Sequence, residues 1–102
     1  MENQFDQIRE RRIELIRYVL NSKKEEYAKG DTNRYHNFDR ASRILEVSPP
    51  RALIGMFVKH LVSVLDIVDN YDKGNFPTEE LVDEKIGDAI NYLILLEGLL
   101  KR

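Results

Sequence analysis

The stretch that decides the fold is residues 50–69, which read PRALIGMFVKHLVSVLDIVD. Its apolar residues do not alternate with polar ones, as they would in a half-buried strand, but cover nearly every side of a helix. Ser48 can cap such a helix, and a proline at the first helical position costs nothing because that N–H has no partner in a helix. We therefore predict a helix from about Pro50 to Asp69 that is apolar nearly all round.

A second helix of the same character is predicted from Thr78 to the C-terminus. Thr78 can accept a hydrogen bond at the N-cap, and Glu79 and Glu80 in the first turn stabilise the positive end of the helix dipole. A polar turn from Asn70 to Asn75 separates the two apolar segments. Two long apolar helices joined by a short turn predict an antiparallel helical hairpin.

The N-terminal part predicts a long amphipathic helix of about 24 residues that ends near Gly30. Its apolar stripe recurs at three- and four-residue spacings, at Phe5, Ile8, Leu15, Ile16 and Val19. A polar and aromatic loop follows, and then a short helix from about Phe38 to Leu45. The fold class is therefore all-α, with a single domain over residues 1–102 in which the long and the short helix pack on the hairpin.

The two hairpin helices also predict self-association. A helix that is apolar all round must be buried all round, and a chain of 102 residues cannot easily enclose two of them. We therefore predict that both helices face a second subunit and complete a four-helix core in a two-fold homodimer.

Composition excludes several function classes. Lys and Arg number 16 against 18 Asp and Glu, a net charge of −2, so we do not expect nucleic-acid binding. The chain has no Cys and two His, which excludes disulfide scaffolds, thiolate metal sites and His-rich metal sites. No apolar run is long enough to span a membrane and no signal peptide is apparent, so we expect a cytoplasmic protein.

Polar residues interrupt the two apolar helices at helical spacing. The first helix carries Lys59, Ser63, Asp66 and Asn70, flanked by His60, and the second carries Glu84, Asp88 and Asn91, with Lys85 beside them. If these stripes face one another, Lys59 and His60 lie near Glu84 or Asp88. Two interpretations stay open, a solvent edge or salt-bridge lattice that fixes packing and a polar pocket that contains carboxylates.

The loop before the short helix adds further candidates. Arg34 and Asn37, with Asp31 and Asn33, fit either turn formation or a phosphate pocket in which Arg34 is the anion ligand. His36 fits either a surface or turn position or a catalytic base. Tyr35 and Phe38, which lie among them, are predicted to insert into the core.

Three blocks of the chain, taken in order, resemble a group of small tailed-phage proteins described as SaV-like or as nucleotide modification associated domains. The blocks are residues 31–38, which read DTNRYHNF, residues 55–66, with the pattern Gly-Met-x-x-Lys-His-x-x-Ser-x-x-Asp, and residues 84–93, which read EKIGDAINYL. The resemblance implies a phage-encoded helical protein that contacts a host protein in the host cytoplasm, with the abortive-infection protein AbiV as the expected partner.

The chain is also distantly similar to the all-α nucleotide pyrophosphohydrolases of the MazG type. Those enzymes hold magnesium with Glu-Glu-x-x-Glu and Glu-x-x-Asp on two helices. Here the second motif keeps Asp88 but has Lys85 in place of its Glu, and Lys59 and His60 stand where the first motif would begin. Because this exchange reverses the local charge, we expect no metal, no cofactor and no catalytic residue.

Two functions follow as expectations. The first is a non-enzymatic interaction protein of phage origin that binds a host protein and modulates an abortive-infection response. The alternative is a nucleotide-binding or nucleoside triphosphate pyrophosphohydrolase-like protein, in which Lys59, His60 and Arg34 bind the anionic ligand directly.

Overall fold

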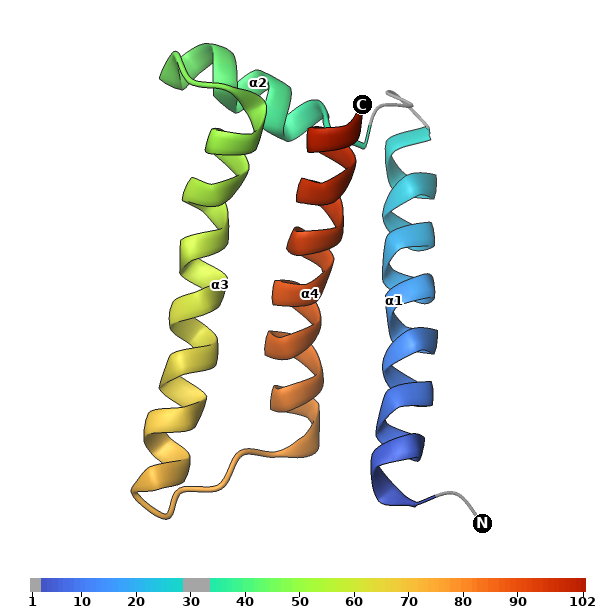
Figure 1. Cartoon of the computed structure of the whole chain (residues 1–102), viewed down its shortest axis with the longest axis vertical. Helices are drawn as coiled ribbons and strands as arrows, with labels where there is room; N and C mark the ends of the chain where they lie inside the picture. Colours follow the sequence, from blue (N-terminus) through green and yellow to red (C-terminus); the bar gives the residue numbers. More distant parts are fainter. Residues whose placement is uncertain (1–2, 29–33) are drawn as a thin grey trace. The chain divides into compact units, whose positions relative to one another are not determined.

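The computed structural model describes residues 3–28 and 34–102 and forms four helices over them, with no strand in either range. Figure 1 shows these helices, α1 (Gln4–Ala28), α2 (His36–Leu45), α3 (Pro49–Asp72) and α4 (Glu79–Lys101). The all-α prediction is confirmed. The predicted end of the first helix at Gly30 lies outside the described residues. None of the helices in these ranges combines the length and the hydropathy needed to cross a lipid bilayer.

The chain divides into two compact units, residues 1–34 and 35–102. In the first unit, α1 starts with a side-chain cap, because the backbone N–H of Asp6 donates to Asn3 Oδ1 at 2.8 Å. Arg9 then pairs with Asp6 at 3.3 Å across one turn. These exposed contacts organise the first turns of α1 but contribute little to stability.

In the second unit, α2 begins at His36, two residues before the predicted start. The cause is local, since the Tyr35 carbonyl accepts from the N–H groups of Phe38 at 3.0 Å and Asp39 at 2.9 Å. The helix ends at Leu45 as predicted. Glu46 then adopts a left-handed conformation, with φ of 57°, and donates its N–H to the Ser42 carbonyl.

The predicted cap of α3 is confirmed, with Ser48 Oγ accepting from the Arg51 N–H at 3.2 Å. The helix begins at Pro49 and continues to Asp72, three residues beyond the predicted end. It continues because the Asn70 carbonyl accepts from the N–H groups of Lys73 at 3.1 Å and Asn75 at 2.9 Å, which closes the last turn. Gly74 then reverses the chain with φ of 86°.

The cap of α4 is also confirmed, since Thr78 Oγ1 accepts from the Leu81 N–H at 3.1 Å. Within the second unit α3 packs against both α4 and α2, and Figure 1 shows α3 and α4 running antiparallel with α2 across one end. The predicted hairpin is therefore present. These contacts place the polar residues of α3 and α4 on neighbouring helices.

The core of this unit is small and lies where α2 crosses the hairpin. Leu53 has no exposed surface, and Phe38 and Leu99 are buried beside it. Partly buried side chains surround these three: Tyr35, Met56, Phe57, Tyr92, Leu95 and Leu96. The prediction that Tyr35 and Phe38 insert into the core is confirmed.

A polar clamp joins α2 to the end of α4. The Arg102 guanidinium donates two hydrogen bonds to the Asp39 carboxylate, one of them at 3.0 Å, and lies 5.2 Å from the centre of the Tyr35 ring. The hydrogen bond to Asp39 raises the pKa of Arg102, which favours the charged guanidinium of this clamp. The clamp fixes α2 over the small core.

Candidate functional site

The predicted polar stripes meet at one point, where His60 of α3 faces Asp88 of α4. His60 Nδ1 lies 3.7 Å from Asp88 Oδ2, and both side chains are partly buried. The distance exceeds that of a hydrogen bond, so the attraction depends on a proton on the imidazole. The predicted neighbourhood of His60 and Asp88 is therefore present.

Tyr92 completes this contact, although the sequence did not identify it as a site residue. Its ring centre lies 4.5 Å from that of His60, with an angle of 38° between the planes. It also lies 6.0 Å from the Phe38 ring in an edge-to-face arrangement. Tyr92 therefore links the polar contact to the core, and the only sequence signal for it was an aromatic one turn after Asp88.

Asn91 supplies an unsatisfied polar atom beside this contact. Its side chain is 8% exposed, and Oδ1 has no hydrogen-bond partner among the described residues. A buried acceptor without a donor destabilises the folded chain unless water or a ligand fills the role. This atom is the one feature of the polar stripes that favours a ligand over a lattice.

The other stripe residues do not converge. Lys59 and Asp66 are exposed on α3, and Glu84 is exposed on α4, where it pairs with its neighbour Lys85 at 3.6 Å. Ser63 Oγ donates to the Lys59 carbonyl of its own helix at 3.2 Å. Most of these residues therefore face solvent and do not contact the other stripe.

The described loop candidates lie at the start of α2, and Asp31 and Asn33 lie outside the described residues. Arg34 directly precedes the second unit, His36 is the first residue of α2, and Asn37 is exposed next to it. Within residues 3–28 and 34–102, no group of three His, Cys, Asp or Glu side chains is arranged to hold a metal ion.

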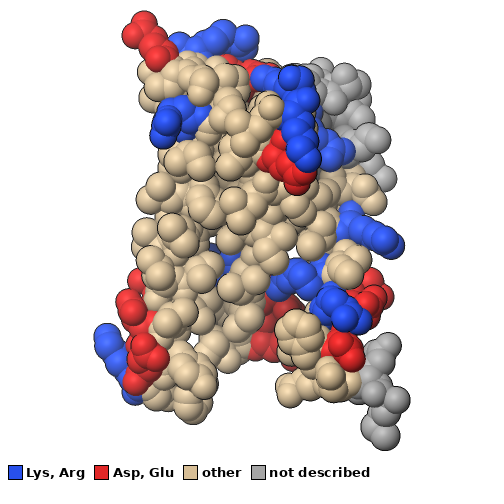
Figure 2. Space-filling model, viewed as in Figure 1, with Lys and Arg blue, Asp and Glu red and all other residues tan. Residues whose placement is uncertain are grey.

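A row of exposed apolar side chains lies on α3 of the hairpin. Five side chains at helical spacing are between 43% and 52% exposed, and we call them the α3 stripe: Val58, Leu61, Val62, Leu65 and Val68. In Figure 2 uncharged side chains cover α3 along most of its length, and acidic side chains gather at its lower end. Exposed apolar surface of this extent is typical of an interaction site.

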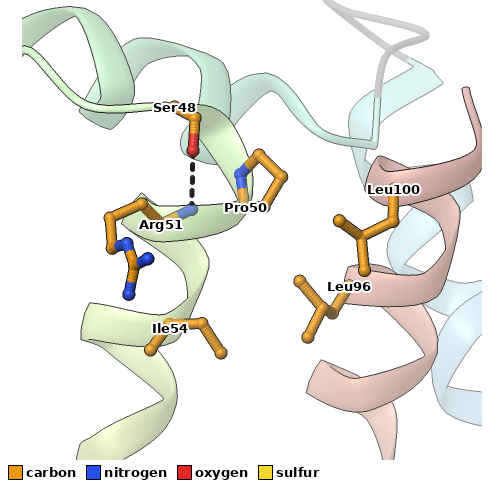
Figure 3. Close-up of a pocket in the computed structure, with 6 residues that line it drawn as sticks. All are labelled: Ser48, Pro50, Arg51, Ile54, Leu96 and Leu100. Carbon is orange, nitrogen blue, oxygen red and sulfur yellow. Dashed lines mark hydrogen bonds between the residues drawn. The ribbon is translucent and has the colours of Figure 1, made fainter.

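A shallow cavity of about 250 Å³ continues this surface between the start of α3 and the end of α4. Figure 3 shows Ile54 of α3 and Leu96 and Leu100 of α4 directed into the same opening. Pro50 and Ser48 form its rim. Arg51 also lines the cavity, but its guanidinium points away from the opening in Figure 3, so the cavity is an apolar hollow suited to an apolar or aromatic side chain.

Comparison of the chain with protein-family models, with curated proteins and with solved structures found no match. The resemblance to the SaV-like proteins therefore stays a prediction.

Proposed function

We propose that this chain is a non-enzymatic interaction protein that forms a homodimer through the apolar face of α3 and α4 and binds a host protein. The observation that carries the homodimer is the α3 stripe, whose five side chains stay about half exposed while the described residues bury a small core. Burying such side chains releases about 25 cal/mol per Å² of apolar surface, which is the main driving force of protein association.

The sequence resemblance specifies the host partner. Because three blocks of the chain resemble SaV-like phage proteins, we propose the abortive-infection protein AbiV as the partner and the host cytoplasm as the place of contact. In this proposal the binding modulates the abortive-infection response, and the chain contributes a surface and no catalytic group.

The direct experiment is a calorimetric titration of purified AbiV with the purified chain. We expect saturable binding at micromolar concentration. Ile44→Asp on α2 and Leu65→Asp on α3 both replace an exposed apolar residue. Titrating AbiV with each variant shows whether binding depends on the α3 stripe. Absence of binding by the folded parent chain at these concentrations would remove AbiV as the partner.

Asn91 favours a second candidate function, nucleotide binding beside His60 and Asp88. The unsatisfied Asn91 Oδ1 could accept from the amino group of a base, and exposed Lys59 could attract phosphate. A thermal-shift screen against nucleotides, with and without magnesium, tests this candidate, since a ligand of the folded state raises Tm. A rise with the parent that Asn91→Leu abolishes would support it, and no shift with any nucleotide would reject it.

A further inference from the structure

We propose that the α3 stripe binds the α3 stripe of a second copy in antiparallel register, about a two-fold axis that passes the helix at the level of Val62 and Ser63. This inference rests on the proposed homodimer and adds its geometry.

The spacing is that of a helix–helix seam. Val58, Leu61, Leu65 and Val68 follow one another at steps of three, four and three residues, with Val62 beside them. This alternation is the one that places apolar side chains of one helix between those of another. The α3 stripe therefore fits a straight helical segment better than a loop or a flat sheet.

The order of the side chains is nearly symmetric. Leu61 and Leu65 lie two residues on either side of Ser63, and Val58 and Val68 lie five residues on either side. Antiparallel pairing about this level brings each Val58 to Val68 of the partner subunit and each Leu61 to Leu65 of the partner subunit. An interface made of one patch meeting itself is the expected form of a two-fold dimer.

The flanking charges favour the antiparallel direction. Lys59 and Asp66 are two turns apart, each directly follows a residue of the stripe, and both are exposed on the same side of α3, outside the seam. A two-fold axis across the helices joins like sides, so Lys59 comes within one residue of the level of Asp66 of the partner subunit, and the symmetry repeats this weak attraction. Parallel pairing would instead keep each of these charges at the level of its own copy.

The exposed aromatic pair Tyr71 and Phe76, with ring centres 5.1 Å apart, lies near the far end of α3 from the cavity.

Antiparallel register brings that aromatic pair to the level of the cavity of the second copy. The level of Ile54 corresponds to that of Asp72, one residue after Tyr71, because both are nine residues from Ser63. The cavity is lined by Ile54, Leu96 and Leu100, which is an apolar surrounding that suits an aromatic ring. The stripe and both of its ends are therefore self-complementary.

Disulfide trapping tests the register, because the chain has no Cys and each variant carries a single thiol. Val62→Cys is expected to cross-link with itself under mild oxidation. Val58→Cys and Val68→Cys are not, because antiparallel copies of either residue lie about ten residues, or roughly 15 Å, apart along the helix, and a disulfide needs Cα atoms closer than about 7 Å. A mixture of these two variants is expected to cross-link.

Glu80→Cys, at an exposed position on α4, is the control for the rate of cross-linking by random collision. Self-cross-linking of Val58→Cys and Val68→Cys at the rate of Val62→Cys would overturn the register in favour of parallel helices. If Val62→Cys cross-links no faster than Glu80→Cys while light scattering shows a dimeric parent, the dimer exists but is not formed through the α3 stripe. A monomeric parent would overturn the dimer itself.

A charge exchange gives a second readout that does not depend on cysteine. Lys59→Asp and Asp66→Lys are each expected to raise the dimer dissociation constant by about two- to threefold, because each variant replaces two weak attractions outside the seam by repulsions. The double variant restores opposite charges and is expected to return near the parent value. If the changes in the free energy of dissociation caused by the two substitutions are additive in the double variant, the predicted attraction between Lys59 and Asp66 of the partner subunit is wrong.

Discussion

His60 Nδ1 lies 3.7 Å from Asp88 Oδ2 while its ring lies 4.5 Å from that of Tyr92, so one imidazole joins a polar and an aromatic contact between α3 and α4. The two contacts differ in strength. The ion pair is partly exposed and too long for a hydrogen bond, whereas the ring contact adds about 0.5–1.5 kcal/mol beyond its buried area.

We therefore predict that His60→Ala destabilises the chain more than Asp88→Asn does. Urea denaturation is expected to give a loss of about 1–2 kcal/mol for His60→Ala and below about 0.5 kcal/mol for Asp88→Asn. Equal losses would mean that the ion pair, and not the ring, holds the helices at this level.

Gly98 gives a second prediction, because a Cβ built there overlaps the Tyr35 hydroxyl. Such overpacking costs about 1–3 kcal/mol, against a gain of about 1 kcal/mol from replacing glycine in a helix. Gly98→Ala is expected to lower Tm by a few degrees, and Tyr35→Phe in the same chain should recover part of the loss. Gly55→Ala is the matched control, because nothing lies within 4 Å of a Cβ there, and a Tm loss equal to that of Gly98→Ala would contradict the account.

Substitutions of Leu53 and Leu65 are expected to affect two different properties, the stability of the fold and the stability of the dimer interface. Leu53 is fully buried, so Leu53→Ala is expected to cost about 2–5 kcal/mol in the free energy of unfolding. Leu65→Ala removes a half-exposed side chain of the α3 stripe and should mainly weaken association. Analytical ultracentrifugation and circular dichroism on both variants check this division, which would fail if Leu65→Ala lost as much helix as Leu53→Ala.

The end of α4 predicts a small pH dependence. The hydrogen bond from Lys101 lowers the pKa of Glu97 below its ordinary value of 4.5. A lowered pKa in the folded chain gives stability that is present above the unfolded value and is lost as pH falls through the folded one. Glu97→Gln should therefore reduce the loss of Tm on acidification below about pH 4.5, and an unchanged acid profile would show that this exposed pair contributes nothing.

The sequence predicted the features that depend on neighbouring residues. Ser48 and Thr78 cap their helices as expected, because capping needs only one side-chain oxygen and an N–H three residues later. The end of α3 was predicted three residues too early, since Asn70 and Asp72 are typical of turns but are held in the helix by the hydrogen bonds that precede Gly74.

The sequence did not predict the features that depend on distant residues. Asp39 and Arg102 are 63 positions apart, and nothing in the pattern of either helix indicates that they pair. The close approach of Tyr35 to Gly98 depends in the same way on how α2 crosses the hairpin. Of the predicted polar stripes, only His60 and Asp88 meet, because helix packing brings together one level of each stripe and leaves the others at the edge.

We expect the exposed face of α3 to be covered by a second copy of the chain. The mass of the purified protein, measured by light scattering at micromolar concentration, tests this expectation. We predict a mass of twice 12.0 kDa for the parent and a shift toward the single-chain mass for Leu65→Asp. No shift is expected for Ile44→Asp, which replaces a more exposed apolar residue that lies off the stripe. A parent mass of 12.0 kDa would contradict this expectation.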